Sequence, residues 1–184
     1  KVDLMRKPIQ VLSELGCENL IITNSAGSLI DDVDPGKLVL IDDHINFTGV
    51  SPLFGIEGNE RFVDMVNAYD PKIRKIFKNV AIENNIPLKE GVYTWFSGPN
   101  FETPSEIRAA KLLGGHVVGM STVPEVILSR FFGLKVAAIS IITNMGAGMG
   151  EDKLSHEKTI KNANAASESL NVLLTQFLKK INDK

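Results

Sequence analysis

Apolar residues recur along the chain with two spacings, one typical of amphipathic helices and the other of buried strands. Residues 2–15 place apolar side chains on one helical face, and Gly16 follows where helices commonly end. Short runs rich in branched residues are typical of strands covered on both faces. These runs predict strands at 20–23, 37–41, 91–97, 117–120 and 136–143.

Helices are predicted wherever a capping signal precedes an amphipathic segment. The clearest signal is Thr103, which Pro104 and Glu106 follow with the spacing of a capping box. Besides residues 2–15, the predicted helices cover 71–85, a segment from 103, a segment 121–132 capped by Ser121 or Thr122, and 155–180. Because helices and strands alternate, residues 1–184 are predicted to form a single α/β domain with a largely parallel central sheet.

Small and polar residues follow four of the predicted strands. The Asn-Ser-Ala-Gly segment at 24–27 is predicted to turn after the first strand, and Glu102, Ser121 and Asn144 follow three others. Repeated glycine and proline residues predict an irregular loop at 44–60. In open α/β sheets, ligands bind beyond the carboxyl ends of the strands. If the sheet is parallel, the four polar ends therefore lie around one crevice.

Each of these polar residues also has a purely structural interpretation. Residues 24–27 fit a tight turn, although their small side chains would also let backbone N–H groups surround an anion. Glu102 fits a helix N-terminus, Ser121 fits a helix cap, and Asn144 fits a turn after a strand. His156 fits a solvated position near the start of a helix. Taken singly, none of them assigns a function.

Composition narrows the classes of function. The net charge is −2, which gives no electrostatic reason to expect nucleic acid or a membrane as a partner. No two histidines have metal-ligand spacing, so no metal is expected, and the glycines at 146–150 lack the lysine of a phosphate loop. The single cysteine, Cys17, predicts a reduced cytosolic protein with a small buried thiol.

Taken together and in order, seven segments resemble the trimeric purine nucleoside phosphorylases that are specific for 6-oxopurines. These segments are TNSAGSL at 23–29, GKLVLIDDHINFTG at 36–49, NERFVDMVNAYD at 59–70, EGVYTWFSGPNFETPSE at 90–106, VVGMSTVPEVILSR at 117–130, ITNMGAG at 142–148 and LSHE at 154–157. The resemblance covers nearly the whole chain. It implies a central mixed, largely parallel β-sheet flanked by helices, and phosphate-dependent cleavage of inosine, guanosine and their deoxy forms.

The resemblance assigns purine binding to residues that follow two of the strands. Phe101 would pack on the base, and Glu102 would accept hydrogen bonds from the purine N1–H and, in guanine, from the exocyclic amine. Asn144 would bind N7 and O6, with Thr143 beside it. Glu102 and Asn144, together with His156, are the catalytic residues that the resemblance implies.

The same resemblance assigns the ribose and phosphate contacts. The Ser25 backbone N–H and the Ser121 hydroxyl would bind phosphate, which is a co-substrate, and no cofactor is implied. Met120 and Tyr93 would line the ribose, and His156 would reach its 5′-hydroxyl.

The resemblance also implies a subunit assembly and a further N-terminal portion of the protein. Phe62 matches the aromatic residue that the family lends to the neighbouring subunit's ribose site, so a cytoplasmic homotrimer is expected. Family members carry a further N-terminal portion, with a phosphate-binding serine loop and an arginine–histidine pair. Without it, the sheet is expected to expose an edge and the chain alone to be nearly inactive. Two other classes stay open, a nucleoside hydrolase and a non-catalytic ligand-binding or oligomer-forming protein.

Overall fold

Five strands close into a small barrel within the described part of the chain, which comprises residues 3–150, 164 and 166–182. In this computed structural model the strands are β1 (Asn19–Ser28), β2 (Leu38–Asn46), β3 (Leu88–Trp95), β4 (Val117–Gly119) and β5 (Lys135–Met145). Around the barrel they follow the order β1-β4-β3-β2-β5, and β5 pairs with β1. The barrel closes through only the last two residues of β1, because Gly27 and Ser28 pair with β4. Residues 19–26 pair with β5 alone and are exposed or half-buried through residue 25, so the expected sheet edge is present along this part of β1.

Strand directions are mixed and most pairs are parallel, as expected. β1 runs parallel to β5 along its whole length, and β3 runs parallel to both β2 and β4. The β1–β4 and β2–β5 pairs are antiparallel. β4 thus reaches the end of β1 from the opposite direction, where Gly27 pairs with Val118. The polar strand ends meet because the barrel closes, and not because all the strands are parallel.

β1 is longer than the sequence predicted, because residues 24–27 continue the strand instead of turning. Asn24, Ser25 and Ala26 pair in register with residues 140–142 of β5. A register shift after Ala26 then brings Gly27 opposite Asn144. The small side chains therefore belong to a strand rather than to a tight turn.

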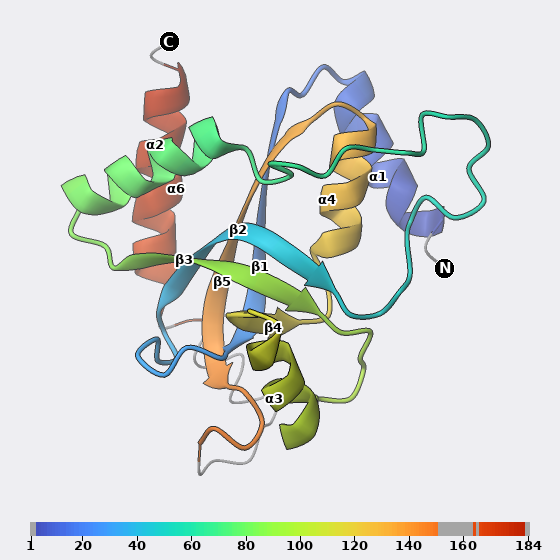
Figure 1. Ribbon diagram of the computed structural model, residues 1–184. Coiled ribbons are helices and arrows are strands. Elements are labelled where there is room, and N and C mark those ends of the chain that lie inside the picture. The colour runs from blue at the N-terminus through green and yellow to red at the C-terminus, as the bar shows by residue number, and fades with distance from the viewer. Residues whose placement is uncertain (1–2, 151–163, 165, 183–184) are drawn as a thin grey trace.

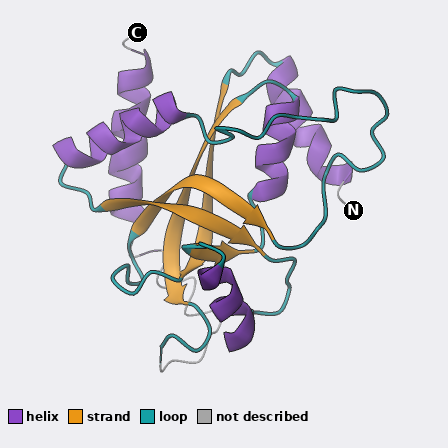
Figure 2. Ribbon diagram, viewed as in Figure 1, coloured by secondary structure: helices purple, strands orange, loops and turns teal. Residues whose placement is uncertain are grey.

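The described helices cover the barrel from several sides (Figure 1, Figure 2). They are α1 (Asp3–Glu14), α2 (Pro71–Glu83), α3 (Pro104–Leu112), α4 (Val123–Phe131) and α6 (Ser167–Asn182). α2 and α6 pack together, and the rings of Phe77 and Phe177 stack with centroids 4.0 Å apart. α1 and α4 pack together elsewhere on the barrel, and Ile107 of α3 shares an apolar cluster with Val118 of β4.

The helix caps agree with the sequence at α3 and differ from it at α4. Thr103 Oγ1 accepts from the Glu106 N–H, and the Glu106 carboxylate accepts from the Thr103 N–H, which completes the predicted capping box. Thr122 occupies the N-cap position of α4 but makes no side-chain cap hydrogen bond. The prediction that Ser121 or Thr122 caps this helix is wrong, because their hydroxyls lie 3.1 Å apart and contact each other instead.

Of three other expectations, the structure corrects two and confirms one in part. β2 extends to Asn46, so His44 lies in a strand and the predicted loop begins after it. Cys17 is exposed rather than buried. The closing helix is confirmed from Ser167 onward, whereas residues 151–163 lie outside the described residues. Among the helices that the structure describes, none is both long and apolar enough to span a membrane.

Candidate functional site

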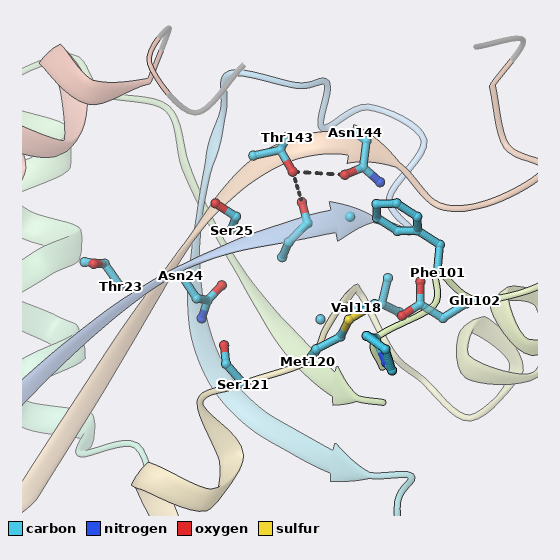
Figure 3. A pocket seen from close by; sticks show the side chains of 14 residues that line it. Thr23, Asn24, Ser25, Phe101, Glu102, Val118, Met120, Ser121, Thr143 and Asn144 are labelled. Atoms are coloured by element: carbon cyan, nitrogen blue, oxygen red, sulfur yellow. Dashed lines mark hydrogen bonds between the residues drawn. The ribbon is translucent and has the colours of Figure 1, made fainter. Parts of the chain in front are cut away.

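A cavity of about 550 Å³ opens where β1, β4 and β5 meet the loops that follow β3 and β4. This volume suits a small organic ligand. The lining comprises residues 23–27, 99, 101–102, 118–121 and 143–144. Figure 3 shows Ser25 and Ser121 toward one end of the cavity, and Phe101 and Glu102 toward the other. The structure thus brings together residues that the sequence placed after four separate strands.

Glu102 places a buried carboxyl group in the cavity wall. Its side chain is 9% exposed, and Oε1 has no hydrogen-bond partner among the residues described. Burial raises the pKa of the Glu102 carboxyl, and the Glu106 carboxylate raises it further, while a backbone hydrogen bond opposes both. An unpaired buried acceptor costs about 1–3 kcal/mol. A ligand N–H group is the partner that this carboxyl lacks.

Asn144 presents a side-chain amide whose orientation is fixed by its neighbours. Buried Thr143 donates from Oγ1 to Asn144 Oδ1 over 2.9 Å, as Figure 3 shows. Asn144 Nδ2 donates to the Met145 carbonyl oxygen, also over 2.9 Å. An amide carries two N–H donors and two acceptor lone pairs. After these two contacts, Asn144 retains one donor and one acceptor for a ligand.

Ser25 and Ser121 supply hydroxyl groups at the other end of the cavity. Ser25 is exposed on β1, and Ser121 is half-buried two residues before α4 begins. A hydroxyl group carries one hydrogen that it can donate to an acceptor. The Ser25 and Ser121 hydroxyls therefore give this end of the cavity two donors for an anionic ligand.

Met120 lies on the cavity wall between the two ends, as Figure 3 shows. Tyr93 is not part of the lining among the described residues. Tyr93 is 0% exposed, and its hydroxyl accepts a hydrogen bond from the Ser121 N–H over 3.3 Å. Burial raises the pKa of the Tyr93 hydroxyl, and hydrogen bonds to Ser121 and Thr122 oppose this rise. A direct ribose contact by Tyr93 does not fit this arrangement, because Tyr93 is covered and supports the Ser121 segment from beneath.

Phe62, which the resemblance also implies, is not part of the cavity lining among the described residues. Phe62 lies on the loop between β2 and α2, is 74% exposed, and has the Arg61 guanidinium 5.0 Å from its ring centroid. His156 lies outside the described residues. The cavity lining within the described chain is thus formed without Phe62.

Sequence reasoning missed two side chains that support the site. Asn24 Nδ2 donates to Thr122 Oγ1 over 2.9 Å, and Ser140 Oγ donates to Asn24 Oδ1 over 2.8 Å. Ser140 is 0% exposed in the middle of an apolar strand. This hydroxyl within an apolar run was the signal that could have revealed the contact. Buried hydroxyls are almost always hydrogen-bonded, so a partner on a neighbouring strand was to be expected.

Comparisons with known proteins give a consistent result. A family model described as the phosphorylase superfamily matches residues 1–179. The chain is 41% identical over 182 residues to purine nucleoside phosphorylase 1 of Geobacillus stearothermophilus, covering 97% of the chain and 65% of that protein. It is 43% identical over 157 residues to purine nucleoside phosphorylase 1 of Bacillus subtilis, covering 84% of the chain and 58% of that protein.

A solved structure of Schistosoma mansoni purine nucleoside phosphorylase in complex with inosine is also similar. It matches with a TM-score of 0.89 and 34% sequence identity, over 95% of the chain and 65% of that protein. The chain thus spans less than two thirds of the length of the relatives it matches.

Proposed function

We propose, because the chain belongs to the phosphorylase superfamily, that it acts as a purine nucleoside phosphorylase. The reaction is the reversible cleavage of the N-glycosidic bond of inosine, guanosine and their deoxy forms by phosphate. Its products are the free purine base and (deoxy)ribose 1-phosphate. One observation carries the proposal: the cavity has Glu102, with its unpartnered Oε1, and the Asn144 amide toward one end, and Ser25 and Ser121 toward the other.

The purine base binds between Phe101, Glu102 and Asn144. The ring of Phe101, 40% exposed beside the cavity, packs on the base. Glu102 accepts from the purine N1–H and, in guanine, from the exocyclic amine. This contact supplies the donor that the buried carboxyl lacks, and it favours the ionised form against the effect of burial. Asn144 donates its remaining N–H to N7 and O6 of the base, which both carry acceptor lone pairs.

Cleavage leaves an oxocarbenium-like sugar and increasing negative charge on the departing purine. A hydrogen bond to the base that becomes stronger as this charge develops lowers the barrier, rather than merely tightening substrate binding. The Asn144 amide is already oriented by Thr143 and Met145, so little reorganisation is needed during the reaction. Asn144 is therefore assigned to stabilise the leaving base, with Glu102 holding its other edge.

Specificity for 6-oxopurines follows from the same carboxylate. Hypoxanthine and guanine carry a hydrogen on N1, whereas adenine has only a lone pair there. Adenine would leave Glu102 Oε1 buried and unpaired, as it is without a ligand. A site that is built to pair a polar group rejects a ligand that leaves that group unpaired. Inosine and guanosine are accordingly the proposed substrates.

Phosphate binds at the other end, with the Ser25 backbone N–H and the Ser121 hydroxyl as donors. It is a co-substrate that attacks the anomeric carbon, and the proposal includes no metal or other cofactor. The ribose lies between base and phosphate, against Met120. His156 is proposed to reach the 5′-hydroxyl from outside the described residues.

The proposed assembly is a cytoplasmic homotrimer. Its support in this chain is a group of exposed apolar side chains on the loop between β2 and α2, comprising Phe54, Phe62 and Val66, which are 66%, 74% and 71% exposed. Exposed apolar groups of this size are typical of subunit interfaces. In the trimer, Phe62 completes the ribose site of the neighbouring subunit.

Synthesis in the reverse direction tests the proposed reaction class. The protein at its full natural length, given hypoxanthine and ribose 1-phosphate, is expected to form inosine and release phosphate. A nucleoside hydrolase cannot carry out this synthesis, because it transfers the sugar to water. A non-catalytic binding protein would form no inosine at any enzyme concentration.

A further inference from the structure

A row of side-chain hydrogen bonds runs from the barrel core to the phosphate end of the cavity. Ser140 Oγ on β5 donates to Asn24 Oδ1 on β1 over 2.8 Å. Asn24 Nδ2 donates to Thr122 Oγ1 over 2.9 Å, and Thr122 Oγ1 lies 3.1 Å from Ser121 Oγ. Ser140 and Thr122 are 0% and 1% exposed, so most of this row is protected from water.

The direction of these hydrogen bonds determines whether the Ser121 hydroxyl presents its hydrogen or its lone pairs to the cavity. The Ser140 hydrogen bonds to Asn24 Oδ1, which turns Nδ2 of the same amide toward Thr122. Thr122 Oγ1 accepts from Asn24, so its own hydrogen is available to Ser121 Oγ. If Thr122 donates to Ser121, the single hydrogen of Ser121 is left for an acceptor in the cavity, with the Tyr93 hydroxyl as the competing partner. Successive hydrogen bonds in one direction also polarise one another.

The backbone at Thr122 gives a second reason to regard this row as functional. Thr122 has φ 76° and ψ −52°, a conformation that β-branched residues rarely adopt. The Val123 N–H donates to the Ser121 carbonyl over 2.8 Å, which closes a three-residue turn of the strained kind around Thr122. Backbone strain of this kind persists only where surrounding contacts enforce it. The Asn24 side chain provides such a contact, and the Ser121 N–H bonded to Tyr93 provides another.

A purely structural role would need only that the buried hydroxyls are satisfied. The row, however, ends at the cavity wall, where Asn24 and Ser121 both lie (Figure 3). We propose that Asn24, Thr122 and Ser140 are positioning residues that hold the Ser121 hydroxyl as a directed hydrogen-bond donor to phosphate. This inference rests on the proposed phosphorylase function.

Thr122→Val is the principal test, since it removes Oγ1 and keeps a β-branched side chain at the strained position. Measured in the protein at its full natural length, it is expected to raise the KM for phosphate about tenfold, the scale of one net hydrogen bond. The KM for inosine and kcat at saturating phosphate are expected to change less than about twofold, because the base end is untouched. Thr122→Ser keeps the hydroxyl and is expected to restore the phosphate KM.

A matched pair of serine variants covers the case in which Thr122→Val does not fold. Ser140→Ala removes the first donor of the row and is expected to raise the phosphate KM in the same direction. Ser129→Ala removes an equally buried hydroxyl that donates to the Glu125 carbonyl within α4, outside the row. It is expected to leave the phosphate KM unchanged. Equal effects of the two serine variants would overturn the proposal.

A double-mutant cycle separates positioning from a general loss of structure. In a Ser121→Ala background, Thr122→Val is expected to have less than about a twofold further effect on the phosphate KM, because Thr122 acts through Ser121. The same factor in both backgrounds would contradict this inference while leaving the phosphorylase function intact. Absence of phosphate-dependent cleavage by the unmutated protein would instead reject the proposed function, and this inference with it.

Discussion

Gly27 lies opposite Asn144 in the β1–β5 ladder and leaves the room that the Asn144 amide occupies. A methyl group at Gly27 would come within 2.9 Å of Asn144 Nδ2 and 3.2 Å of Val118 Cγ2. No real side chain tolerates the first of these distances without a shift. The absence of a side chain at Gly27 is therefore part of how the end of the cavity that contains Asn144 is shaped.

Gly27→Ala is expected to displace the Asn144 amide and to lower kcat/KM for inosine by about tenfold or more, since overpacking of a well-packed site costs about 1–3 kcal/mol. Gly150→Ala is the matched control, because a methyl group there would meet Met145 only at an ordinary 3.7 Å. Steady-state kinetics of both variants makes the comparison. Equal kcat/KM for the two would show that the close contact at Gly27 does not matter.

Glu102→Gln and Asn144→Ala are each expected to lower inosine phosphorolysis by roughly 10²-fold or more, the scale of losing one transition-state hydrogen bond. The affected quantity is kcat/KM for the nucleoside, measured in folded variants at saturating phosphate. Near-unchanged values would reject the assignment of the purine end.

The raised pKa of Glu102 also predicts the direction in which the stability of the protein changes with pH. Because burial raises the pKa of this carboxyl above its ordinary 4.5 in the folded protein, folding favours its protonated form. Its contribution to stability is fully present below about pH 4.5 and is lost as the pH rises through the raised pKa. Ionisation of this carboxyl at higher pH therefore lowers the stability of the unliganded protein.

Glu102→Gln is accordingly expected to stabilise the unliganded protein at neutral pH by about 1 kcal/mol, or roughly 2–4 °C in Tm, while lowering activity. The gain is expected to shrink toward pH 4.5, where the native carboxyl is protonated. Thermal unfolding across this pH range measures it. A Glu102→Gln protein that is less stable than the parent at neutral pH contradicts the placement of a buried carboxyl with an unpaired Oε1 in the cavity.

Phe62 connects the proposed assembly to the proposed site. Phe62→Ala is expected to raise the KM for inosine several-fold while leaving the phosphate KM unchanged, because in the proposed trimer this side chain contacts the ribose bound by a neighbouring subunit. Ile82→Ala, at an equally exposed apolar position on α2, is the control. Light scattering is expected to give three times the subunit mass. A monomer in solution, with full activity after Phe62→Ala, would reject the trimer.

The sequence predicted the local structure best where one signal dominates. The capping box at Thr103 and the apolar run of β5 appear as expected, since short-range hydrogen bonds and continuous burial determine them. Residues 24–27 were misread because small residues favour turns, yet pairing with β5 outweighs that local preference. Barrel closure could not be predicted, because it depends on the antiparallel β1–β4 contact between distant segments.

In the candidate site, too, some features could be predicted from the sequence and others depend on contacts between distant segments. Individually, Glu102 and Asn144 fitted ordinary structural positions, and the order of whole segments singled them out. The placement of Tyr93 behind Ser121, and the contacts of Asn24 with Ser140 and Thr122, depend on side-chain packing in three dimensions. No spacing in the sequence encodes them.

The phosphate dependence of inosine cleavage tests the central claim most directly. Release of hypoxanthine from inosine by the protein at its full natural length is followed with and without added phosphate, together with the formation of ribose 1-phosphate. We expect hypoxanthine release to require phosphate and to equal ribose 1-phosphate formation mole for mole. Hypoxanthine release at the same rate without phosphate, with free ribose as the other product, would contradict it.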